Sequence, residues 1–232
     1  MNIALLLSGG TGTRLGGNIP KQYIEVGEKP IISYCIERLS LHKKIDAIWI
    51  VAAVEWQEQI KEWLEQTDIY GKFLGFSIPG ENRQLSILHG LEDMKQYMDE
   101  ESLVLVCDAV RPLLSEKQIT ECFKAIVGYD GVLPVLPMKD TVYLSSDGER
   151  VTALLNRSEI FAGQAPELFR FDKYYEANKR LLPHEILRIN GSTEPAIMAG
   201  MNIAMIPGDE NNFKITTQAD LERFCEIVKK KD

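Results

Sequence analysis

The stretch that decides the fold is Leu5-Leu6-Leu7-Ser8-Gly9-Gly10-Thr11-Gly12-Thr13-Arg14-Leu15-Gly16-Gly17, which is followed after two residues by Pro20-Lys21-Gln22-Tyr23. A short apolar run that ends in glycines is typical of a buried parallel strand that leads into a turn. Glycines let backbone N–H groups approach an anion without interference from a Cβ atom. Arg14 and Lys21 add two fixed positive charges on the same loop. The stretch therefore predicts a loop that holds phosphate groups.

Three other interpretations of the glycine-rich loop remain open but fit less well. A plain strand-to-helix connection would not need the charges of Arg14 and Lys21. A dinucleotide-binding loop needs an acidic residue about 20 residues after the glycines, whereas Ala52 and Ala53 stand at the end of the second predicted strand. A P-loop needs Gly-Lys followed by Ser or Thr, and the loop does not contain it.

Composition limits the class of protein. The chain has 232 residues, 45% of them hydrophobic, which is enough for one domain over residues 1–232 with a full core. Its formal charge of −8 argues against nucleic acid as a partner. No apolar run approaches the roughly 20 residues of a membrane span, so we expect no membrane association and a cytoplasmic location. Phosphate ligands must therefore be held by individual cations.

Strand and helix patterns alternate along the chain. Apolar residues with a helical period of 3.6 separate short apolar runs, the arrangement that predicts a doubly wound sheet. The predicted strands span 2–7, 45–53, 76–78, 103–107, 132–136 and 201–206; the predicted helices span 30–41, 56–64, 87–98, 115–127, 172–181 and 217–230. The fold class is thus α/β: a Rossmann-like open, mostly parallel twisted sheet that is flanked by helices.

Two further strand ends carry polar residues. The loop Pro79–Ser86 follows a strand and enters a helix, the place where open α/β sheets bind ligands, so Gly80, Arg83 and Ser86 are candidate binding residues. Arg83 could instead order its own loop. Asp108 ends the strand 103–107, where a carboxylate that faces a phosphate loop could share a divalent cation with it. The alternative for Asp108 is a cap on the turn before Pro112.

A hairpin interrupts the alternation. Residues 139–144 and 151–155 are strand-like and are separated by Ser145-Ser146-Asp147-Gly148, which predicts a protruding β-hairpin with an Asp-Gly turn. An isolated two-stranded ribbon is marginally stable. We therefore expect this arm, at about 138–163, to cap a site or to mediate dimerisation.

Seven motifs, taken in order, resemble a known enzyme family. They are Gly9–Arg14 with Pro20–Tyr23, Arg83–Ser86, Asp108–Pro112, Lys139–Thr141, Arg157, Gln164–Pro166 and Asn212–Thr216. This set is similar to the cytidylyltransferases that make CDP-linked polyols, which act on 2-C-methyl-D-erythritol 4-phosphate or on ribitol 5-phosphate. The likeness spans nearly the whole chain.

The resemblance implies a reaction and roles for individual residues. The phosphate of a polyol would attack the α-phosphorus of CTP with Mg²⁺ bound and release pyrophosphate. The implied catalytic residues are Arg14, Lys21 and Lys214, and the implied metal ligand is Asp108. The nucleotide would be bound by Ser8, Gly9, Gly10, Thr11, Gly12, Thr13, Gly80, Arg83, Ser86 and Asp108, and the acceptor by Arg111, Thr141, Arg157 and Ser192. The resemblance also implies a homodimer whose arm delivers Arg157 to the partner, although Thr141 and Arg157 could be ordinary hairpin residues.

The chain departs from the erythritol enzymes on the acceptor side. Ala165 replaces a threonine before the proline, Cys107 replaces a histidine before the metal aspartate, and Ser192-Thr193-Glu194 matches the corresponding stretch only loosely. The first expectation from the resemblance is 2-C-methyl-D-erythritol 4-phosphate as acceptor, in isoprenoid precursor synthesis. The alternatives are ribitol 5-phosphate, for wall or capsule polymers, and a nucleotide-binding protein without turnover.

Overall fold

The structure, a computed structural model, describes residues 1–10 and 19–230. In that part of the chain, eight strands form one central sheet and two pairs of short strands lie outside it. The strands are β1 (Asn2–Leu7), β2 (Glu25–Val26), β3 (Lys29–Pro30), β4 (Ala47–Val51), β5 (Phe73–Ser77), β6 (Leu103–Asp108), β7 (Gly131–Pro137), β8 (Val142–Leu144), β9 (Ala153–Leu155), β10 (Phe161–Gly163), β11 (Glu167–Arg170) and β12 (Ile203–Pro207). The helices are α1 (Ile31–Leu41), α2 (Val54–Thr67), α3 (Arg83–Met94), α4 (Glu116–Ala125), α5 (Phe171–Lys179), α6 (Glu194–Met198) and α7 (Gln218–Lys229).

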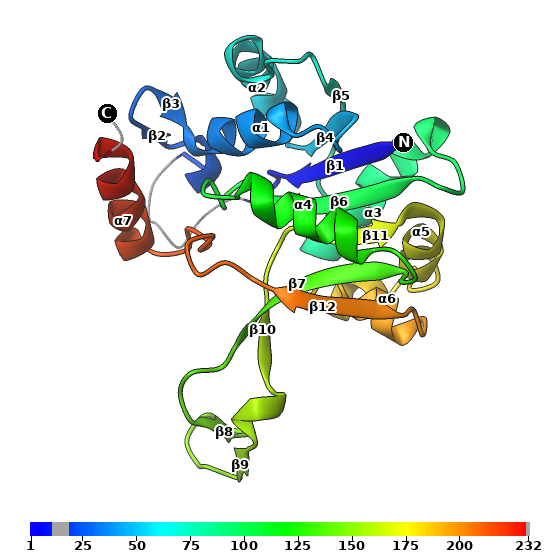
Figure 1. The fold of residues 1–232 in the computed structure, drawn as a ribbon, viewed down its shortest axis with the longest axis vertical. Helices are drawn as coiled ribbons and strands as arrows, with labels where there is room; N and C mark the ends of the chain where they lie inside the picture. The colour runs from blue at the N-terminus through cyan, green and yellow to red at the C-terminus, as the bar shows by residue number, and fades with distance from the viewer. Residues whose placement is uncertain (11–18, 231–232) are drawn as a thin grey trace.

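The central sheet is mostly parallel. Its strand order is β10-β7-β11-β6-β1-β4-β5, and β12 pairs with β7 (Figure 1). Strand β1 runs parallel to both β4 and β6, and β4 runs parallel to β5. Strand β11 runs antiparallel to its neighbours β6 and β7. The carboxyl ends of β1, β4 and β6 therefore meet at one edge of the sheet.

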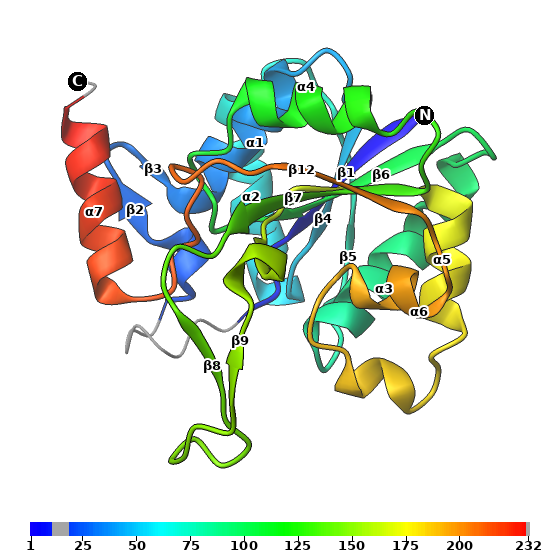
Figure 2. The same cartoon turned by 60° about the horizontal axis from the view of Figure 1, so that its bottom comes forward.

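Helices cover both faces of the sheet, as the predicted α/β class requires. Figure 2 shows α1 and α4 on one side and α3, α5 and α6 on the other. Residues that alternate along β1 point to opposite sides: Leu6 packs with α1, α2 and α4, whereas Leu5 packs with α3 and α5. Both side chains are fully buried. Helix α7 packs separately, through Phe224, against Val26 and Ile31.

The arm projects away from the sheet (Figure 1). Strands β8 and β9 pair antiparallel, with Val142 opposite Leu155. The predicted Asp-Gly turn is wrong in its length, because eight residues, 145–152, connect the two strands. The Asp147 carboxylate accepts backbone hydrogen bonds from Glu149 and Arg150, which stabilises this longer loop. The predicted end of the arm also shifts, since β10 already pairs with β7 in the central sheet.

One predicted helix begins earlier than its apolar period indicates. Helix α3 begins at Arg83 instead of residue 87. The reason is a cap: Asn82 Oδ1 accepts a hydrogen bond from Leu85 N at 2.8 Å. This start places Arg83 and Ser86 on the first two turns of a helix, rather than on a free loop.

Helix α7 begins with a capping box around Asp220. Its Oδ2 accepts hydrogen bonds from the backbone N–H and hydroxyl groups of Thr216 and Thr217 at 2.8 to 2.9 Å. Burial alone would raise the pKa of Asp220, but these hydrogen bonds outweigh it and lower the pKa to about 2. Because the folded pKa lies below the usual value of 3.8, the stabilisation is complete above pH 3.8 and is lost as the pH falls towards 2.

We therefore expect Asp220→Ala to lower the free energy of unfolding by about 1 kcal/mol at pH 7. Chemical denaturation followed by circular dichroism measures this loss. Glu226→Ala, an exposed glutamate on the same helix, is the control. Equal stability of the Asp220→Ala and Glu226→Ala proteins at pH 7 would contradict the role of this cap.

No helix in residues 1–10 and 19–230 has both the length and the apolar character that crossing a membrane requires.

Candidate active site

A cleft of about 490 Å³ opens at the carboxyl ends of β1, β4 and β6. Open α/β sheets bind ligands at this edge. Residues from six segments of the chain form its walls. The lining residues are Leu7, Gly9, Gly10, Lys21, Gln22, Val51, Gly80, Glu81, Asn82, Arg83, Ser86, Asp108, Val110 and Lys214.

Gln22 and Tyr23 fasten the start of the glycine-rich loop. Gln22 Nε2 donates to the carbonyl oxygens of Ser8 and Gly10, at 2.7 and 2.8 Å. The Ser8 hydroxyl donates to Tyr23 Oη at 2.9 Å. Gln22, Tyr23 and Ser8 are all buried. These hydrogen bonds fix the backbone that would face a phosphate. From the sequence, Lys21 was the only residue of Pro20–Tyr23 with a predicted role.

The first two loops of the cleft touch at Gly9. A Cβ atom at Gly9 would lie 2.4 Å from Pro79 Cβ, so only glycine permits this approach. On the second loop, Gly80 N donates to Ser86 Oγ at 3.0 Å, and Ser86 Oγ donates to the carbonyl of Asn82 at 2.8 Å. Gly80 and Ser86 therefore hold the shape of the second loop as well as lining the cleft.

Asp108 is surrounded by three cations. Arg83 Nη2 lies 2.9 Å from Oδ1, whereas Arg111 Nε and Lys214 Nζ each lie 3.2 Å from Oδ2. Burial alone would raise the pKa of this carboxyl, but Arg83, Lys214 and Arg111 outweigh it and hold the pKa well below its usual value. Three positive charges around one negative charge make this part of the cleft attractive to anions, although the whole chain is acidic.

Arg111 also holds the loop that carries Lys214. Its Nη1 donates to the carbonyl of Asn212 at 2.7 Å. Gln164 Nε2 donates to the same carbonyl at 3.2 Å, and Asn212 Nδ2 donates to the carbonyl of Ala165 at 2.9 Å. Lys214 thus reaches the cleft from a loop that is anchored at several points.

The structure brings some of the predicted residues together and separates others. Gly9, Gly10, Lys21, Gly80, Arg83, Ser86, Asp108 and Lys214 line the cleft. Ser8 lies directly behind it, and Arg111 reaches Asp108 from the next turn. Thr11, Gly12, Thr13 and Arg14 lie outside the described residues.

The other predicted acceptor residues do not line this cleft. Thr141 and Arg157 lie on the exposed arm, where Arg157 Nη1 donates to the carbonyl of Lys139 at 2.7 Å. Ser192 precedes α6 and is only 3% exposed, with its hydroxyl enclosed. Their assignment to the acceptor therefore stays a prediction.

A magnesium ion at this cleft would find Asp108 at the end of β6, whereas Glu81, which also lines the cleft, lies on the exposed second loop. Within the described residues, no three His, Cys, Asp or Glu side chains gather as an all-protein metal cage would require. Mg²⁺ is commonly held by one or two carboxylates together with substrate phosphates and waters. Asp108 beside the glycine-rich loop fits that pattern.

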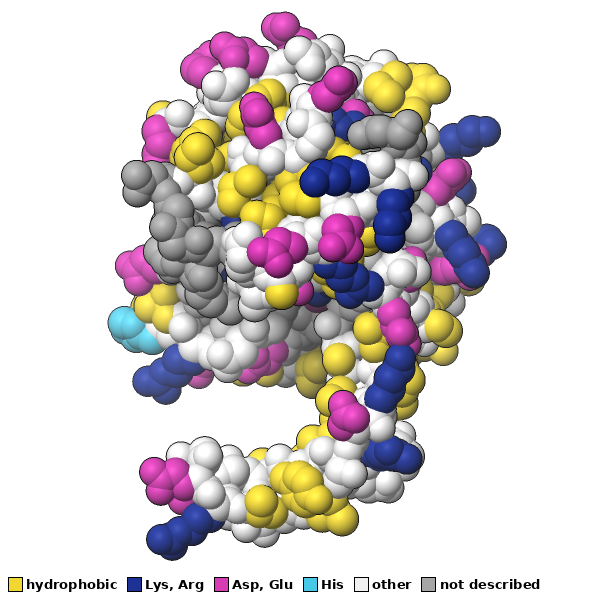
Figure 3. Space-filling view, turned by 90° about the vertical axis from the view of Figure 1, so that its left-hand side faces the viewer, with side chains coloured by type: hydrophobic (Ala, Val, Ile, Leu, Met, Phe, Trp, Pro, Cys, Tyr) yellow, Lys and Arg dark blue, Asp and Glu magenta, His cyan; other side chains and the backbone are white. Residues whose placement is uncertain are grey.

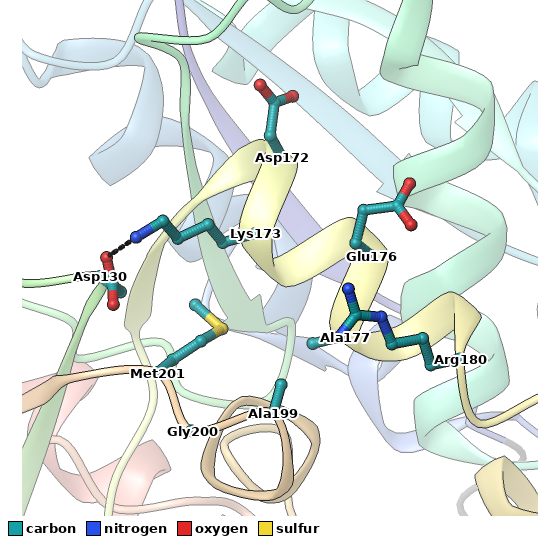
Figure 4. Close-up of a pocket in the computed structure, with 9 residues that line it drawn as sticks. All are labelled: Asp130, Asp172, Lys173, Glu176, Ala177, Arg180, Ala199, Gly200 and Met201. Atoms are coloured by element: carbon teal, nitrogen blue, oxygen red, sulfur yellow. Dashed lines mark hydrogen bonds and ion pairs between the residues drawn. The ribbon is translucent and has the colours of Figure 1, made fainter.

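A second hollow, of about 390 Å³, lies between α5 and the segment before β12 (Figure 4). Asp130, which pairs with Lys173 at 2.6 Å, precedes β7, and Met201 precedes β12. Because β7 and β12 run in the same direction as β6, their starts lie at the opposite edge of the sheet from the carboxyl end of β6. This hollow is therefore separate from the cleft around Asp108.

Comparison with known proteins gives consistent matches over the whole chain. The sequence model of the 2-C-methyl-D-erythritol 4-phosphate cytidylyltransferase family matches residues 2–230. The chain is 27% identical to the ribitol-5-phosphate cytidylyltransferase of Lactiplantibacillus plantarum, covering 100% of both proteins. It is 28% identical to the enzyme of that name from Streptococcus pneumoniae, covering 99% of this chain and 100% of the relative.

A solved structure supports the family match. The 4-diphosphocytidyl-2C-methyl-D-erythritol synthase of Anaerococcus prevotii superposes with a TM-score of 0.83 at 26% identity, over 98% of this chain and 96% of that one. The mostly parallel sheet and its flanking helices are thus confirmed as the fold of these enzymes. The chain belongs to the 2-C-methyl-D-erythritol 4-phosphate cytidylyltransferase family, and it is a nucleotidyltransferase.

Proposed function

We propose that this enzyme transfers CMP from CTP to ribitol 5-phosphate and releases pyrophosphate. One observation supports CTP as the nucleotide substrate: Arg83, Arg111 and Lys214 surround Asp108 in a cleft that a glycine-rich loop borders. Such a cleft neutralises a triphosphate without any covalent chemistry of the protein.

The residues of the cleft divide the work of an in-line displacement at the α-phosphorus. Lys21 and Lys214 neutralise the charge that develops on the α-phosphate, and Arg14 is assigned to the same task from the sequence alone. Gly80 and Ser86 meet the nucleoside, and the backbone of Gly9 and Gly10 meets the phosphates. Asp108 would hold Mg²⁺, which supplies charge neutralisation to the triphosphate when it is bound.

The acceptor is assigned from the curated relatives and from Ala165, at which this chain differs from the erythritol enzymes. The two ribitol-5-phosphate cytidylyltransferases named above match the whole chain. Ala165, where the erythritol enzymes have a threonine, is buried and offers no hydroxyl. The second candidate acceptor is 2-C-methyl-D-erythritol 4-phosphate, for isoprenoid precursors, because the family model names this compound and the Anaerococcus enzyme is named as a 4-diphosphocytidyl-2C-methyl-D-erythritol synthase.

Pyrophosphate release from CTP and Mg²⁺, with each acceptor in turn, tests the assignment. We expect kcat/KM for ribitol 5-phosphate to exceed that for 2-C-methyl-D-erythritol 4-phosphate by about 100-fold, since a site built to hydrogen-bond particular hydroxyls rejects a mismatched polyol strongly. The opposite preference would overturn the acceptor assignment. Absence of release with both acceptors would overturn the proposed reaction.

The proposal includes a homodimer of this one-domain chain, in which the arm forms the contact between the two copies. It exposes large apolar side chains in the view of Figure 3, and Tyr143 and Leu154 are 58% and 66% exposed. A ribbon of two short strands is marginal unless it packs against something. In a homodimer, Thr141 and Arg157 would reach the acceptor bound by the partner. The proposed reaction takes place in the cytoplasm.

We expect Leu154→Glu to convert this dimer into monomers, because a charge would replace apolar surface in the contact. Sedimentation velocity at equal concentration measures the change. Ile69→Glu, at an exposed apolar residue between α2 and β5, is the matched control and should leave the dimer intact. If the unaltered protein sediments as a monomer, the arm does not mediate dimerisation.

A further inference from the structure

A second carboxylate lies behind Asp108 on the same face of the sheet. Glu167 begins β11 and pairs with Val106, two residues before Asp108 on β6. Cross-strand partners point to the same face, and residues two apart on a strand do likewise. Glu167 and Asp108 are therefore diagonal neighbours under the helices α3 and α5. Glu167 is only 8% exposed.

Glu167 lies beside two enclosed hydroxyls, and in the part of the chain that the structure describes none of these groups forms a hydrogen bond of normal geometry. Its Oε2, the Ser192 hydroxyl and the Thr193 hydroxyl are all enclosed and form no hydrogen bond within the described residues. Burial raises the pKa of Glu167; the charge of Arg83 lowers it, the charge of Asp108 raises it, and the neighbouring Ser192 and Thr193 side chains lower it. Unsatisfied buried polar groups are costly and rare in native proteins. This cluster therefore needs an explanation.

Arg83 contacts one of the two carboxylates and lies within the electrostatic reach of the other. Its guanidinium pairs with Asp108 Oδ1, and the charges of both Asp108 and Glu167 act on it. Within residues 1–10 and 19–230, Arg83 and Glu167 form no ion pair. Asp108 is the carboxylate that pairs with Arg83, although the buried carboxylate of Glu167 lies nearby.

The contacts of Asp108 decide which cation would leave it. Oδ2 is shared by Arg111 and Lys214, whereas Oδ1 contacts only Arg83 among the ion pairs of the described residues. A divalent cation needs one of these oxygens, and the displacement of one guanidinium from Oδ1 disturbs the fewest contacts. A displaced Arg83 would then be a partly buried charge, which is expensive without a new partner.

We propose that Glu167 is a positioning residue for the reaction: it receives the Arg83 guanidinium when Asp108 Oδ1 turns to the divalent cation that accompanies CTP. The proposal rests on the proposed function, because it assumes that the cleft binds CTP with a divalent cation. It gives Arg83 two alternative partners and explains why Glu167 Oε2 lacks one in this structure.

Glu167→Gln tests the exchange with almost no change of side-chain shape. An amide binds a guanidinium far more weakly than a carboxylate does. The Arg83 guanidinium should therefore stay paired with Asp108 and compete there with the divalent cation. We expect the Mn²⁺ concentration for half-saturation, in the presence of CTP, to rise about tenfold when bound Mn²⁺ is followed by electron paramagnetic resonance. The kcat at saturating metal should stay within about twofold. The melting temperature should not fall, because Glu167 is not part of an ion pair here.

Arg83→Gln provides the second arm of the experiment. Without the guanidinium, Asp108 Oδ1 is available, so Glu167→Gln should have no further effect on Mn²⁺ binding in the Arg83→Gln background. Such non-additivity is expected only of groups that interact. Independent effects of the two substitutions, or an unchanged Mn²⁺ affinity in Glu167→Gln, would overturn the proposal.

The outcomes separate this inference from the proposed function. If the unaltered protein binds CTP with Mn²⁺ and Glu167→Gln binds it equally well, only the role of Glu167 fails. If the unaltered protein shows no CTP-dependent Mn²⁺ binding, the proposed function and this inference both fail. A lower melting temperature of Glu167→Gln, with its Mn²⁺ affinity unchanged, would make Glu167 a merely structural residue.

Discussion

Asp108→Asn is expected to lower kcat/KM for CTP by about 100- to 1000-fold. Losses of this size are typical when one preorganised electrostatic group of an active site is removed. The substitution removes the proposed metal ligand and leaves Arg83, Arg111 and Lys214 without the charge that they share. Initial rates of pyrophosphate release at saturating acceptor measure the effect.

The same substitution should also destabilise the protein, but moderately. Breaking a buried ion pair costs roughly 3 to 5 kcal/mol, and the loss here should be smaller because Arg83 and Lys214 are 31% and 37% exposed. Thermal melting therefore accompanies the kinetic assay, to establish that the variant is folded at the assay temperature. Asp172→Asn, at an exposed aspartate on α5, is the control and should keep its full rate. An Asp108→Asn enzyme with a rate within threefold of the unaltered one would show that this carboxylate is dispensable.

Gly9→Ala is expected to weaken CTP binding by about 10- to 100-fold. The added Cβ would lie 2.4 Å from Pro79 Cβ and 3.0 Å from Pro79 Cγ. A proline ring cannot rotate away, so one of the two loops must move. A displacement of about 1 Å in a positioned site can cost about 100-fold. Isothermal titration calorimetry with CTP measures the affinity directly.

Gly10→Ala is the matched comparison for Gly9→Ala. The two glycines are neighbours on one loop, but no described atom lies within 4 Å of a Cβ at Gly10. Gly10→Ala should therefore lose clearly less affinity than Gly9→Ala. Equal losses in both variants would mean that the Pro79 contact is unimportant, and that the two glycines act only through their own backbone conformation.

The sequence was sufficient to predict the fold class and those cleft residues that belong to a short motif. The apolar run before Gly9 predicted β1, and the alternation of strands and helices predicted the fold class. Lys21, Asp108 and Lys214 follow recognisable motifs, and the structure places all three at one cleft. Their exact chemical roles, and those of Thr11 to Arg14, stay predictions.

Other features depend on contacts between distant residues and left no local signal. The start of α3 depends on the Asn82 cap, which apolar periodicity does not detect. The sharing of Asp108 by three cations depends on strand register and on the loop of Lys214. Gln22 and Gln164 stand in the motifs Pro20–Tyr23 and Gln164–Pro166, but nothing in these motifs indicates that each side chain donates a hydrogen bond to a backbone carbonyl.

The place where the arm leaves the sheet has a consequence for how this enzyme can change over evolution. Pro137, the last residue of β7, pairs with Phe161, the first residue of β10, so the arm begins and ends at adjacent positions of the sheet. Insertions, deletions or exchanges between these two residues need not alter the register of β6, β1 or β4. An arm from a relative could therefore be grafted between residues 137 and 161 while the cleft around Asp108 keeps its strands, which makes the arm a separately exchangeable part of the fold.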